Sequence, residues 1–380
     1  MSSYAIFSAQ HLPYIGGIET FTDNLAKALA LRGHSVTIVT NDTEGLSDRE
    51  SLDEKITIVR LPCHPLLKGR LPLPKLLSRN RAKLIDSIVN QRFDGVLINT
   101  RLYPHSLLGM SIAEKQGLKP VVLDHGSAYL CFSNPIIDPL VKVYEDVITA
   151  WGKARHAADY YAISKQSAKW LEHFGIKAKG VISNSIDALA FRNMASSRNF
   201  REELGLEPSA LLIAFIGRLI PEKGIHQMME VAQHPTIIQK DVHFVIAGKG
   251  PLADRVKAAE GNLHYVGPIT RQDASALLQQ AYLHCLPSRS EGFASSLLEA
   301  SACGCPSITT GVGGAAELIP SSEYGTIIKT QNAPDIVAAI NTLANKPNLR
   351  DKQSEACKAI VEEKYSWDKT AQLVECALSQ

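Results

Sequence analysis

Two glutamates in the second half of the chain, Glu291 and Glu299, have the side chain that hydrolyses glycosidic bonds in many enzymes. Paired carboxyl groups do this when they lie about 5 Å apart in retaining enzymes, or about 6.5–9.5 Å apart in inverting ones. The two glutamates are eight positions apart, and eight residues of helix rise about 12 Å and turn the side chains about 80° apart. The spacing therefore disfavours a hydrolytic pair. Either the glutamates hold two parts of one long ligand, or one lies on a helix surface and the other caps the helix.

The residues around these glutamates predict a strand, a tight turn and a short helix. The strand covers residues 283–286, and the turn lies at Gly292. We expect the helix to begin near Ala294 or Ser295, where small hydroxyl side chains can cap it, and to end at Gly304. Both carboxylates then lie near the carboxyl end of a strand, where open α/β sheets bind ligands.

Two further motifs follow neighbouring apolar runs of the same half. The motif G-R-L-I-P-E-K-G, residues 217–224, places Arg218 and Lys223 directly after an apolar run. The fork-shaped guanidinium of an arginine beside the point charge of a lysine suits a diphosphate. G-K-G-P-L, which includes Gly250, follows the next run in the same way. Each motif alone is consistent with a solvated loop, but three at one sheet edge indicate a ligand site. A fourth glycine-rich turn, 311–314, either completes that site or only shapes a loop.

The first half of the chain carries two weaker candidates. Gly16 and Gly17 follow the first apolar run and open a helix, so backbone N–H groups there can face a phosphate. The order G-G-I-E departs from the dinucleotide pattern G-x-G-x-x-G, and adjacent glycines often form only a turn. His125 ends another apolar run. A lone histidine is usually structural, and its place at the end of a strand is equally consistent with catalysis.

Strands that alternate with helices must position these motifs. The predicted strands lie at 4–7, 35–39, 56–59, 95–98, 121–123 and 160–163 in the first half, and at 211–216, 242–246, 263–266, 283–286, 307–309 and 325–328 in the second. Helical periodicity fills the intervals, which predicts an α/β chain with two doubly wound parallel sheets. We expect two domains, residues 1–187 and 188–365, that face a cleft.

Composition and charge disfavour several other classes of protein. The chain has 380 residues, of which 45% are hydrophobic, and a net charge of +2, so it can bury two cores and has no need of a nucleic-acid partner. Its seven cysteines lack metal-ligand spacing and are interpreted as reduced residues of a cytosolic protein. We expect no signal peptide, and no apolar run reaches the roughly 18 residues that span a bilayer.

Taken in order, the motifs resemble a known family. G-G-I-E, H-G, N-S-I-D, G-R-L-I-P-E-K-G, G-K-G-P-L, S-E-G-F-A-S-S-L-L-E-A and a terminal Y-S-W are similar to the retaining glycosyltransferases of family 4, over nearly the whole chain. The resemblance implies the GT-B architecture, with two Rossmann-like domains and a last helix, 366–380, that crosses back onto the first. It also implies transfer of a sugar from a nucleotide-sugar donor to a glycan or lipid-linked acceptor, in the synthesis of a surface polysaccharide or glycolipid.

The resemblance assigns a role to each motif. Arg218 and Lys223 would grip the donor diphosphate, Glu299 the ribose and Glu291 the transferred sugar, beside which His125 would lie. The implied catalytic residues are His125, Glu291, Arg218 and Lys223. The implied donor-binding residues are Gly16, Gly17, Arg218, Lys223, Gly250, Val266, Ile269, Glu291, Gly292, Phe293, Ala294 and Glu299. We expect acceptor contacts from two segments of the first domain, 99–103 and 129–134.

The absence of a D-x-D motif gives no indication of a metal, and we expect no cofactor. Cations would stabilise the charge that develops on the leaving diphosphate. The acceptor would attack from the front face, with the leaving phosphate oxygen taking its proton, so Glu291 would position the sugar rather than act as a nucleophile. Two alternatives stay open: a non-catalytic sugar-nucleotide-binding protein, and a sugar-nucleotide epimerase of the same two-domain plan.

A basic segment, residues 61–85, suggests an additional partner. It contains no acid, and leucines alternate with its cations, which are Lys68, Arg70, Lys75, Arg79, Arg81 and Lys83. Basic and apolar residues together suit an anionic membrane surface, which would bring the protein to a lipid-linked acceptor. The alternative is a solvated helix and loop with an ordinary buried face. We therefore expect a cytoplasmic protein, with peripheral association at the inner face of a membrane as the open question.

Overall fold

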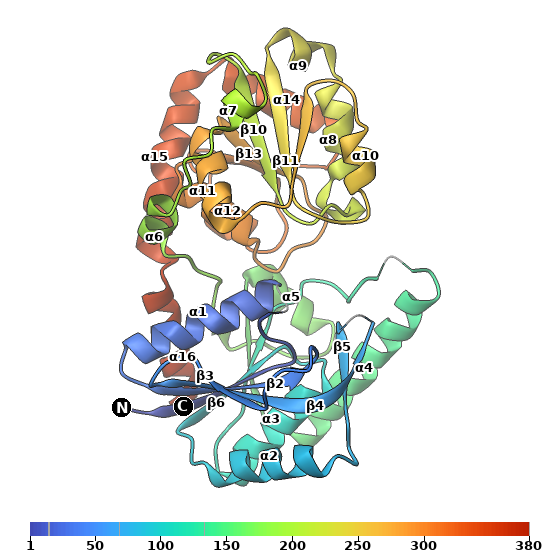
Figure 1. Ribbon diagram of the computed structural model, residues 1–380, viewed down its shortest axis with the longest axis vertical. Helices are drawn as coiled ribbons and strands as arrows, with labels where there is room; N and C mark the ends of the chain where they lie inside the picture. Colours follow the sequence, from blue (N-terminus) through green and yellow to red (C-terminus); the bar gives the residue numbers. More distant parts are fainter. Residues whose placement is uncertain (14–15, 68, 133, 380) are drawn as a thin grey trace. The chain divides into compact units, whose positions relative to one another are not determined.

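The computed structural model describes residues 1–13, 16–67, 69–132 and 134–379. The chain divides into two compact units (Figure 1). Unit 1 consists of Met1–Asn184 together with Trp367–Gln380, and unit 2 consists of Ser185–Ser366. Each unit is an α/β domain with its own sheet and core. The assignment of the acceptor to one unit and of the donor to the other, and the cleft itself, stay predictions.

Unit 1 is built on a largely parallel sheet. Its strands are β1 (Ser3–Ser8), β2 (Ser35–Asp42), β3 (Arg49–Ser51), β4 (Ile56–Leu66), β5 (Leu71–Pro74), β6 (Gly95–Asn99), β7 (Val121–Asp124), β8 (Asp159–Ala162) and β9 (Gly180–Val181). Their order is β3-β4-β2-β1-β6-β7-β8-β9, with β5 paired to β4. Phe7 on β1 and Ile98 on β6 are paired in parallel register and fully buried. The strands read as continuous apolar runs because helices cover both faces of the sheet.

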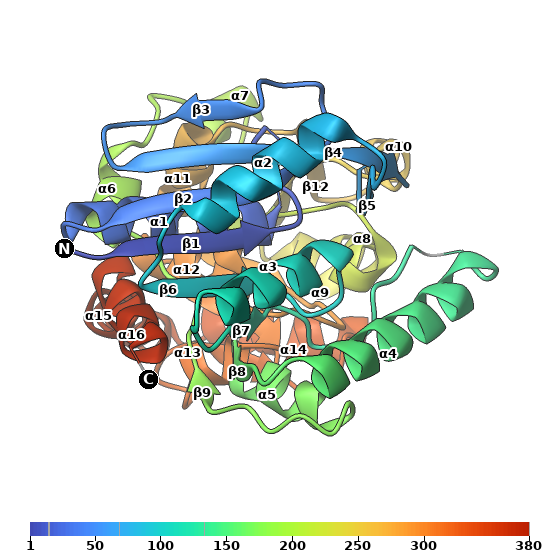
Figure 2. The same ribbon diagram turned by 90° about the horizontal axis from the view of Figure 1, so that it is seen from below.

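The helices of unit 1 lie on the two faces of its sheet. They are α1 (Gly17–Leu31), α2 (Arg79–Asn90), α3 (Pro104–Lys115), α4 (Ile137–Arg155), α5 (Lys165–Glu172) and α16 (Trp367–Leu378). Figures 1 and 2 show α1 on one face and α2 and α3 on the other. Arg32, at the end of α1, forms ion pairs with Asp368 and Glu375 of α16, both at 2.6 Å. The C-terminal helix is thereby held against α1.

The basic segment at 61–85 contains a β-hairpin and the start of α2, so the helix of the second interpretation is present and its loop is partly a hairpin. Residues 61–66 continue β4, which pairs antiparallel with β5 so that Leu66 lies opposite Leu71. Arg81 is buried, and its Nη1 donates to the carbonyl of Pro62 at 3.2 Å. This cation therefore supports the fold and is not available to a membrane. Lys68 lies outside the described residues.

Unit 2 contains a second, wholly parallel sheet. Its strands are β10 (Leu211–Ile216), β11 (Val242–Ala247), β12 (Leu263–Gly267), β13 (Leu283–Leu286), β14 (Ser307–Thr310) and β15 (Thr326–Ile328). Their order is β12-β11-β10-β13-β14-β15. The predicted strands of both halves are therefore present, and the prediction of two doubly wound parallel sheets is confirmed.

The helices of unit 2 form two groups around its sheet. They are α6 (Ala188–Asn193), α7 (Phe200–Glu203), the 3₁₀ turn η1 (Pro221–Lys223), α8 (Ile225–Ala232), α9 (Pro235–Gln239), α10 (Ala253–Lys257), α11 (Arg271–Gln280), α12 (Ser295–Ala302), α13 (Ala315–Leu318), α14 (Ala333–Ala344) and α15 (Pro347–Lys364). Helices α8, α9 and α14 pack together, and α6, α11 and α12 form the second group. Phe215 and Phe244, on neighbouring strands, are fully buried between them.

The strand order of each sheet reverses at one point. In unit 2 the chain runs outward from β10 to β12 and then returns to place β13 on the other side of β10. In unit 1 the same reversal separates β1 from β6. Loops at the carboxyl ends of the strands beside such a reversal diverge and leave a crevice that binds ligands in open α/β sheets. In the described ranges no helix has the length and hydropathy needed to cross a bilayer.

Candidate functional site

The loops on the two sides of the reversal in unit 2 are joined by an ion pair. Lys223 follows β10 and Glu291 follows β13, and the Lys223 Nζ contacts the Glu291 Oε1. Their side chains are only 14% and 12% exposed, respectively. The backbone N–H of Arg289 also donates to the carbonyl of Glu222 at 2.8 Å. The structure therefore brings together two of the predicted site residues, from loops that are 68 positions apart in sequence.

Arg218 lies in the same loop as Lys223 and is exposed. Among the described residues its guanidinium takes part in no ion pair or side-chain hydrogen bond that the structure defines, whereas Lys223 is held by Glu291. A forked cation that is not committed to a carboxylate can bind a phosphate through two parallel N–H groups. The loop after β10 thus carries one fixed cation and one exposed cation.

Glycines allow the neighbouring loops to pack on this one. A Cβ on Gly248 would overlap the carbonyl oxygen of Gly217, and a Cβ on Gly250 would overlap that of Leu219. The N–H of Leu219 donates to the carbonyl of Lys249 at 2.9 Å, across the two loops. The structure therefore gives Gly250, predicted as a donor-binding residue, a packing role of its own. The donor contact stays a prediction.

The turn at residues 311–314 packs on the loop after β13. A Cβ on Gly313, whose φ is +58°, would lie 2.5 Å from the carbonyl oxygen of Gly292, and one on Gly314 would overlap the Phe293 ring. The Gly314 N–H donates to the Gly292 carbonyl at 3.0 Å. Phe293 is 8% exposed and its ring lies 5.4 Å from that of Tyr365. The ring of Phe293 is therefore packed within the fold, and the contact of this residue with a donor stays a prediction.

Helix α12 begins at Ser295, as the sequence predicts, but its cap differs from the prediction. The N-cap residue is Ala294, which has no hydroxyl and makes no side-chain cap. The helix ends as predicted, with Gly304 at a φ of +67°. The positive partial charge of this helix N-terminus therefore lies at the edge of the sheet where Glu291 lies.

Glu299 lies inside α12, as predicted, and its side chain is partly buried. Burial raises the pKa of its carboxyl, against the opposing charge of Arg271. Val266 and Ile269 are half-buried at and just after the end of β12, which is the outermost strand of the same sheet. The structure thus places these three residues at carboxyl ends of strands or in the helix that follows one, and their contacts with a donor stay predictions.

In unit 1 the loop after β1 leads to Gly16, the N-cap of α1, which makes no side-chain cap. A Cβ on Gly16 would overlap the carboxyl of Glu19, whereas one on Gly17 would meet nothing within 4 Å. Glu19 is 4% exposed, and burial raises its pKa to about 7. A buried carboxyl with a raised pKa at a helix N-terminus is a functional-site candidate. The sequence analysis quoted this glutamate in G-G-I-E but gave it no role.

His125 follows β7 and takes part in a chain of hydrogen bonds. Its Nε2 lies 3.0 Å from the Asn99 Oδ1, and the Asn99 amide donates to the Thr22 hydroxyl at 2.8 Å. The ring of Phe21 meets the imidazole edge-on at 4.9 Å. Burial lowers the pKa of His125 to about 4, against the opposing charge of Asp124. The ring is therefore neutral at pH 7, with Nε2 as the donor and Nδ1 as the acceptor.

The segment 99–103 does not present the acceptor contacts that we expected of it, because all five residues are buried. The guanidinium of Arg101 forms ion pairs with Asp124 at 2.6 Å and Glu145 at 2.7 Å, and it lies 3.9 Å from the centre of the Phe174 ring. This segment supports the core of unit 1. The second predicted acceptor segment, 129–134, is partly exposed, and its Ser133 lies outside the described residues.

No cluster of three or more histidine, cysteine, aspartate or glutamate side chains that could hold a metal ion occurs in the part of the chain that the structure describes. The prediction that the reaction needs no metal stays a prediction.

Comparison with known families decides between the alternatives that the sequence left open. A profile described as Glycosyltransferase Family 4 matches residues 15–188, and one described as Glycosyl transferases group 1 matches residues 196–359. Together the matches cover most of both units. The chain belongs to glycosyltransferase family 4. It is therefore a glycosyltransferase of the GT-B fold, and the predicted family is confirmed over the binding-protein and epimerase alternatives.

Several known proteins are similar to this family 4 glycosyltransferase. An uncharacterized glycosyltransferase of Methanocaldococcus jannaschii is 24% identical over 96% of this chain and 95% of its own. The D-inositol 3-phosphate glycosyltransferase of Segniliparus rotundus is 24% identical over 94% of this chain and 82% of its own. The crystal structure of Anabaena Alr3699/HepE in complex with UDP-glucose superposes with a TM-score of 0.72, at 18% identity, over 99% of this chain and 98% of that one.

Proposed function

We propose that this family 4 glycosyltransferase moves a sugar, with retention of its anomeric configuration, from a nucleotide diphosphate-sugar held by unit 2 to a glycan or lipid-linked acceptor. The observation that carries the proposal is the ion pair between Lys223 and Glu291. It joins the two loops that flank the strand-order reversal of unit 2, where this sheet type binds nucleotides. The UDP-glucose complex of the similarly folded Anabaena protein supports the class of donor.

In this proposal, positive charge in unit 2 binds the donor diphosphate. The exposed guanidinium of Arg218 offers a bidentate contact, and Lys223 supplies a point charge whose position is set by Glu291. The N-terminus of α12, at the same edge of the sheet, adds the positive partial charge of the helix dipole. Inside the same helix, the partly buried carboxylate of Glu299 would accept hydrogen bonds from the two ribose hydroxyls.

The transfer step breaks the bond between the sugar's anomeric carbon and the diphosphate oxygen, and the electron pair stays on that oxygen. The acceptor oxygen bonds to the anomeric carbon from the same face, and its proton passes to the leaving phosphate oxygen. Arg218 and Lys223 stabilise the negative charge that develops on the diphosphate. Glu291 positions the sugar, because its carboxylate is already held by Lys223.

Unit 1 would contribute two groups with shifted pKa values to the reaction. Burial raises the pKa of Glu19 to about 7, so the protonated fraction of this carboxyl does not repel a phosphate that approaches the backbone of Gly16 and Gly17. His125 is neutral because burial lowers its pKa to about 4. Its Nε2 is held by Asn99, so its Nδ1 would accept a hydrogen bond from a sugar hydroxyl. We propose that the acceptor is a growing surface polysaccharide or a glycolipid.

The stereochemical part of the proposal is tested by slow donor hydrolysis in the absence of acceptor, when water takes the acceptor's place. Proton NMR recorded during the first minutes identifies the anomer that is released before mutarotation. We expect the anomer of the donor, and we expect Lys223→Met to suppress its release while Lys257→Met, an exposed lysine of α10, does not. Release of the opposite anomer would exclude retention.

A further inference from the structure

Arg70 lies in the connection between β4 and β5, and buried side chains from two other loops hold that connection. The Gln10 side chain, from the loop after β1, donates to the carbonyl of Gly69. The Tyr103 hydroxyl, from the loop after β6, donates to the carbonyl of Arg70 at 3.4 Å. Gln10 and Tyr103 are each 6% exposed. The backbone of Arg70 is therefore fixed by well-buried partners.

The guanidinium of Arg70 is held by the loop after β7. It lies 4.2 Å from the centre of the Phe132 ring, and its Nη2 donates to the carbonyl of Cys131 at 3.4 Å. The Phe132 N–H in turn donates to the carboxylate of Asp138 at 2.8 Å. A guanidinium stacked on an aromatic ring is pre-oriented, and its edge remains available for hydrogen bonds. The position of Arg70 is thus set by the fold of unit 1 itself.

These contacts bring Arg70 to the point where the strand order of unit 1 reverses. The reversal separates β1 from β6, and β7 is the strand next to β6. The β4–β5 connection contacts the loops that follow all three of these strands, although β4 lies two places away from β1. Open α/β sheets bind ligands in the crevice at such a reversal. Arg70 therefore lies at the edge of unit 1 where a ligand is expected, together with His125 at the end of β7.

Arg70 has unused capacity for hydrogen bonds. A guanidinium has five N–H donors, and among the described residues that of Arg70 makes one hydrogen bond and no ion pair that the structure defines. Neither segment 61–85 nor segment 125–137 contains an aspartate or a glutamate. Asp138, which follows them, keeps its negative charge, but its carboxylate accepts backbone N–H groups of its own loop, at 2.8 and 3.2 Å. The charge of Arg70 is therefore not committed to a carboxylate of unit 1.

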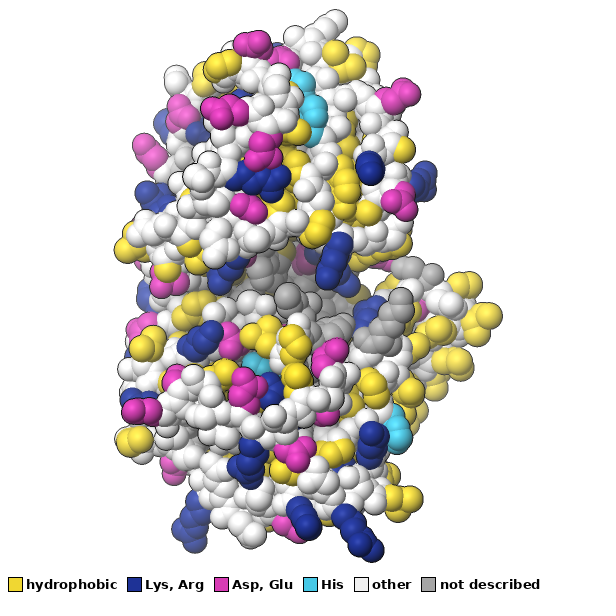
Figure 3. All heavy atoms as spheres, viewed as in Figure 1, with side chains coloured by type: hydrophobic (Ala, Val, Ile, Leu, Met, Phe, Trp, Pro, Cys, Tyr) yellow, Lys and Arg dark blue, Asp and Glu magenta, His cyan; other side chains and the backbone are white. Residues whose placement is uncertain are grey.

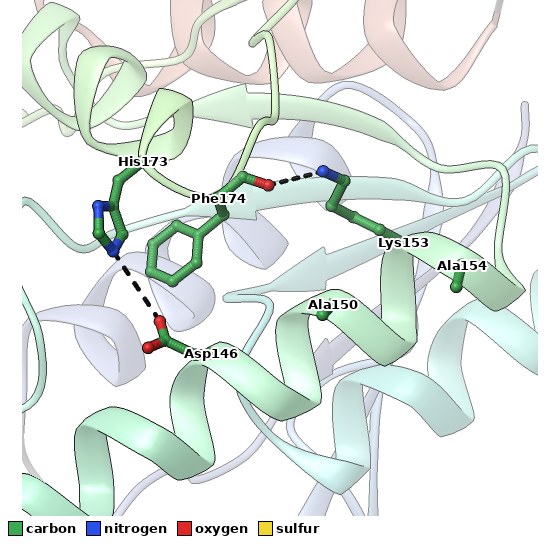
Figure 4. Close-up of a pocket in the computed structure, with 6 residues that line it drawn as sticks. All are labelled: Asp146, Ala150, Lys153, Ala154, His173 and Phe174. Atoms are coloured by element: carbon green, nitrogen blue, oxygen red, sulfur yellow. Dashed lines mark hydrogen bonds and ion pairs between the residues drawn. The ribbon is translucent and has the colours of Figure 1, made fainter.

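Other charged groups of unit 1 are paired or dispersed. On the face of this unit that Figure 3 shows, Lys and Arg side chains are scattered among acidic ones. Figure 4 shows a cavity of about 570 Å³ between α4 and the end of α5. Its lysine, Lys153, donates to the carbonyl of Phe174 at 2.6 Å, and His173 lies 3.9 Å from the carboxylate of Asp146. Arg70 differs from these groups because its stacked guanidinium is both fixed and unpaired.

A fixed and unpaired guanidinium matches a group with two parallel acceptor oxygens, which a phosphate or a carboxylate provides. The proposed function, on which this inference rests, assigns the donor diphosphate to Arg218 and Lys223 of unit 2, so Arg70 remains for the acceptor. We propose that Arg70 binds a phosphate or carboxylate group carried by the acceptor. The enzyme then selects an anionic acceptor, since an uncharged one would leave this guanidinium without its partner.

The proposal is tested by NMR with three probes that share one ring: glucose, glucose 6-phosphate and glucuronate. The full chain is labelled with nitrogen-15, and the Nε–Hε signal of Arg70 is assigned by its loss in Arg70→Lys. We expect a saturable shift of this signal with at least one of the two anions, and none with glucose or with potassium chloride at equal ionic strength. The two anions separate recognition of a phosphate from recognition of a carboxylate.

The affinity of the anionic probe is measured from the backbone amide shift of Phe132, which every variant retains. Arg70→Gln should bind this probe about tenfold or more weakly, because a charge-assisted bidentate contact is lost. The matched control Arg79→Gln removes an exposed cation of the same basic segment and should bind like the wild type. Urea unfolding of Arg70→Gln shows whether unit 1 is still folded. A purely structural role of Arg70 would alter that unfolding without discrimination between glucose and its anionic relatives.

Three results would overturn the proposal. Neither anion shifts the Arg70 signal more than chloride does, or glucose shifts it as much as the anions do. Alternatively, folded Arg70→Gln binds the anionic probe as tightly as Arg79→Gln. Thermal stabilisation of the wild type by nucleotide-sugars is measured separately. Its absence counts against the proposed function, whereas stabilisation by a donor without a response of Arg70 to the anions counts against this inference alone.

Discussion

The buried carboxyl of Glu19 makes the stability of unit 1 depend on pH in a calculable way. Its pKa is raised to about 7 by burial, from an ordinary value of 4.5. A group whose folded pKa is raised binds protons more tightly in the folded state, so stability falls as the pH rises from the unfolded pKa through the folded one. Above about pH 7 the carboxylate is charged in both the folded and the unfolded state, and the full loss of folding stability is present.

The magnitude follows from the two pKa values. Relative to strong acid, ionisation of Glu19 lowers the free energy of unfolding by about 0.8 kcal/mol at pH 5.0 and by about 3.4 kcal/mol at pH 8.5. We therefore expect Glu19 alone to remove about 2.5 kcal/mol of stability between pH 5.0 and pH 8.5. Glu19→Gln lacks this ionisation. The stability of the variant minus that of the wild type should therefore rise by about 2.5 kcal/mol between pH 5.0 and pH 8.5.

Tryptophan fluorescence provides a selective assay, because Trp151, Trp170 and Trp367 all lie in unit 1. Urea unfolding is followed at both pH values for the wild type, Glu19→Gln and the control Glu54→Gln, an exposed glutamate of the same unit. The control should keep the pH dependence of the wild type. A difference between Glu19→Gln and the wild type that is equal at pH 5.0 and 8.5 would show that Glu19 is not buried as a protonated carboxyl.

Three further outcomes are expected. Arg101→Met should destabilise unit 1 by about 3–5 kcal/mol in urea unfolding, because it leaves two buried carboxylates without their partner; a loss under 1 kcal/mol would contradict this. The His125 ring should titrate below pH 5 by NMR, since burial lowers its pKa to about 4, and a midpoint near 6.5 would be inconsistent with its burial. Gly250→Ala should lower the melting temperature of unit 2, because its Cβ overlaps the Leu219 carbonyl, whereas in Gly217→Ala the Cβ meets only the Phe215 ring at 3.5 Å; equal melting of the two variants would refute the packing role.

The strands were predictable because buried parallel strands are continuous apolar runs. Residues 211–216 and 283–286 were predicted with the bounds that the structure has. The hairpin of β4 and β5 escaped prediction because its prolines, among them Pro65 and Pro72, argue against strands. They are tolerated because β5 pairs only with β4, away from the main strand order.

The site was predictable in so far as chemistry depends on residues close together in sequence. The loop with Arg218 and Lys223 and the helix with Glu299 were read from local motifs. The burial of Arg101 was not, because its partners Asp124 and Glu145 are 23 and 44 positions away, and only the folded chain brings them together. We expected Arg101 to be accessible to an acceptor, because the sequence does not show that these two carboxylates lie beside it in the fold.

Helical periodicity predicts a helix between the strands at 121–123 and 160–163, where α4 lies, but it does not tell which face of the helix is buried. Aliphatic residues occur on both faces of this helix: Val141 and Ile148 lie inward, while Val143 and Val147 are exposed. The polar residue Glu145 lies on the buried face because Arg101 is there to pair with it. The exposure of Val143 and Val147 is therefore a property of the tertiary structure and has no signature in the sequence alone.

The measurement that tests the central claim most directly is thermal unfolding against a panel of UDP-, GDP-, ADP- and TDP-sugars. A donor at 100 times its dissociation constant should add about 2.7 kcal/mol to the stability of the state that binds it. The account predicts that donors with one base stabilise the wild type and the control Arg255→Ala, and that they fail to stabilise Arg218→Ala and Glu299→Ala. Stabilisation of Arg218→Ala equal to that of the wild type, or no response of the wild type to any donor, would contradict a donor site in unit 2.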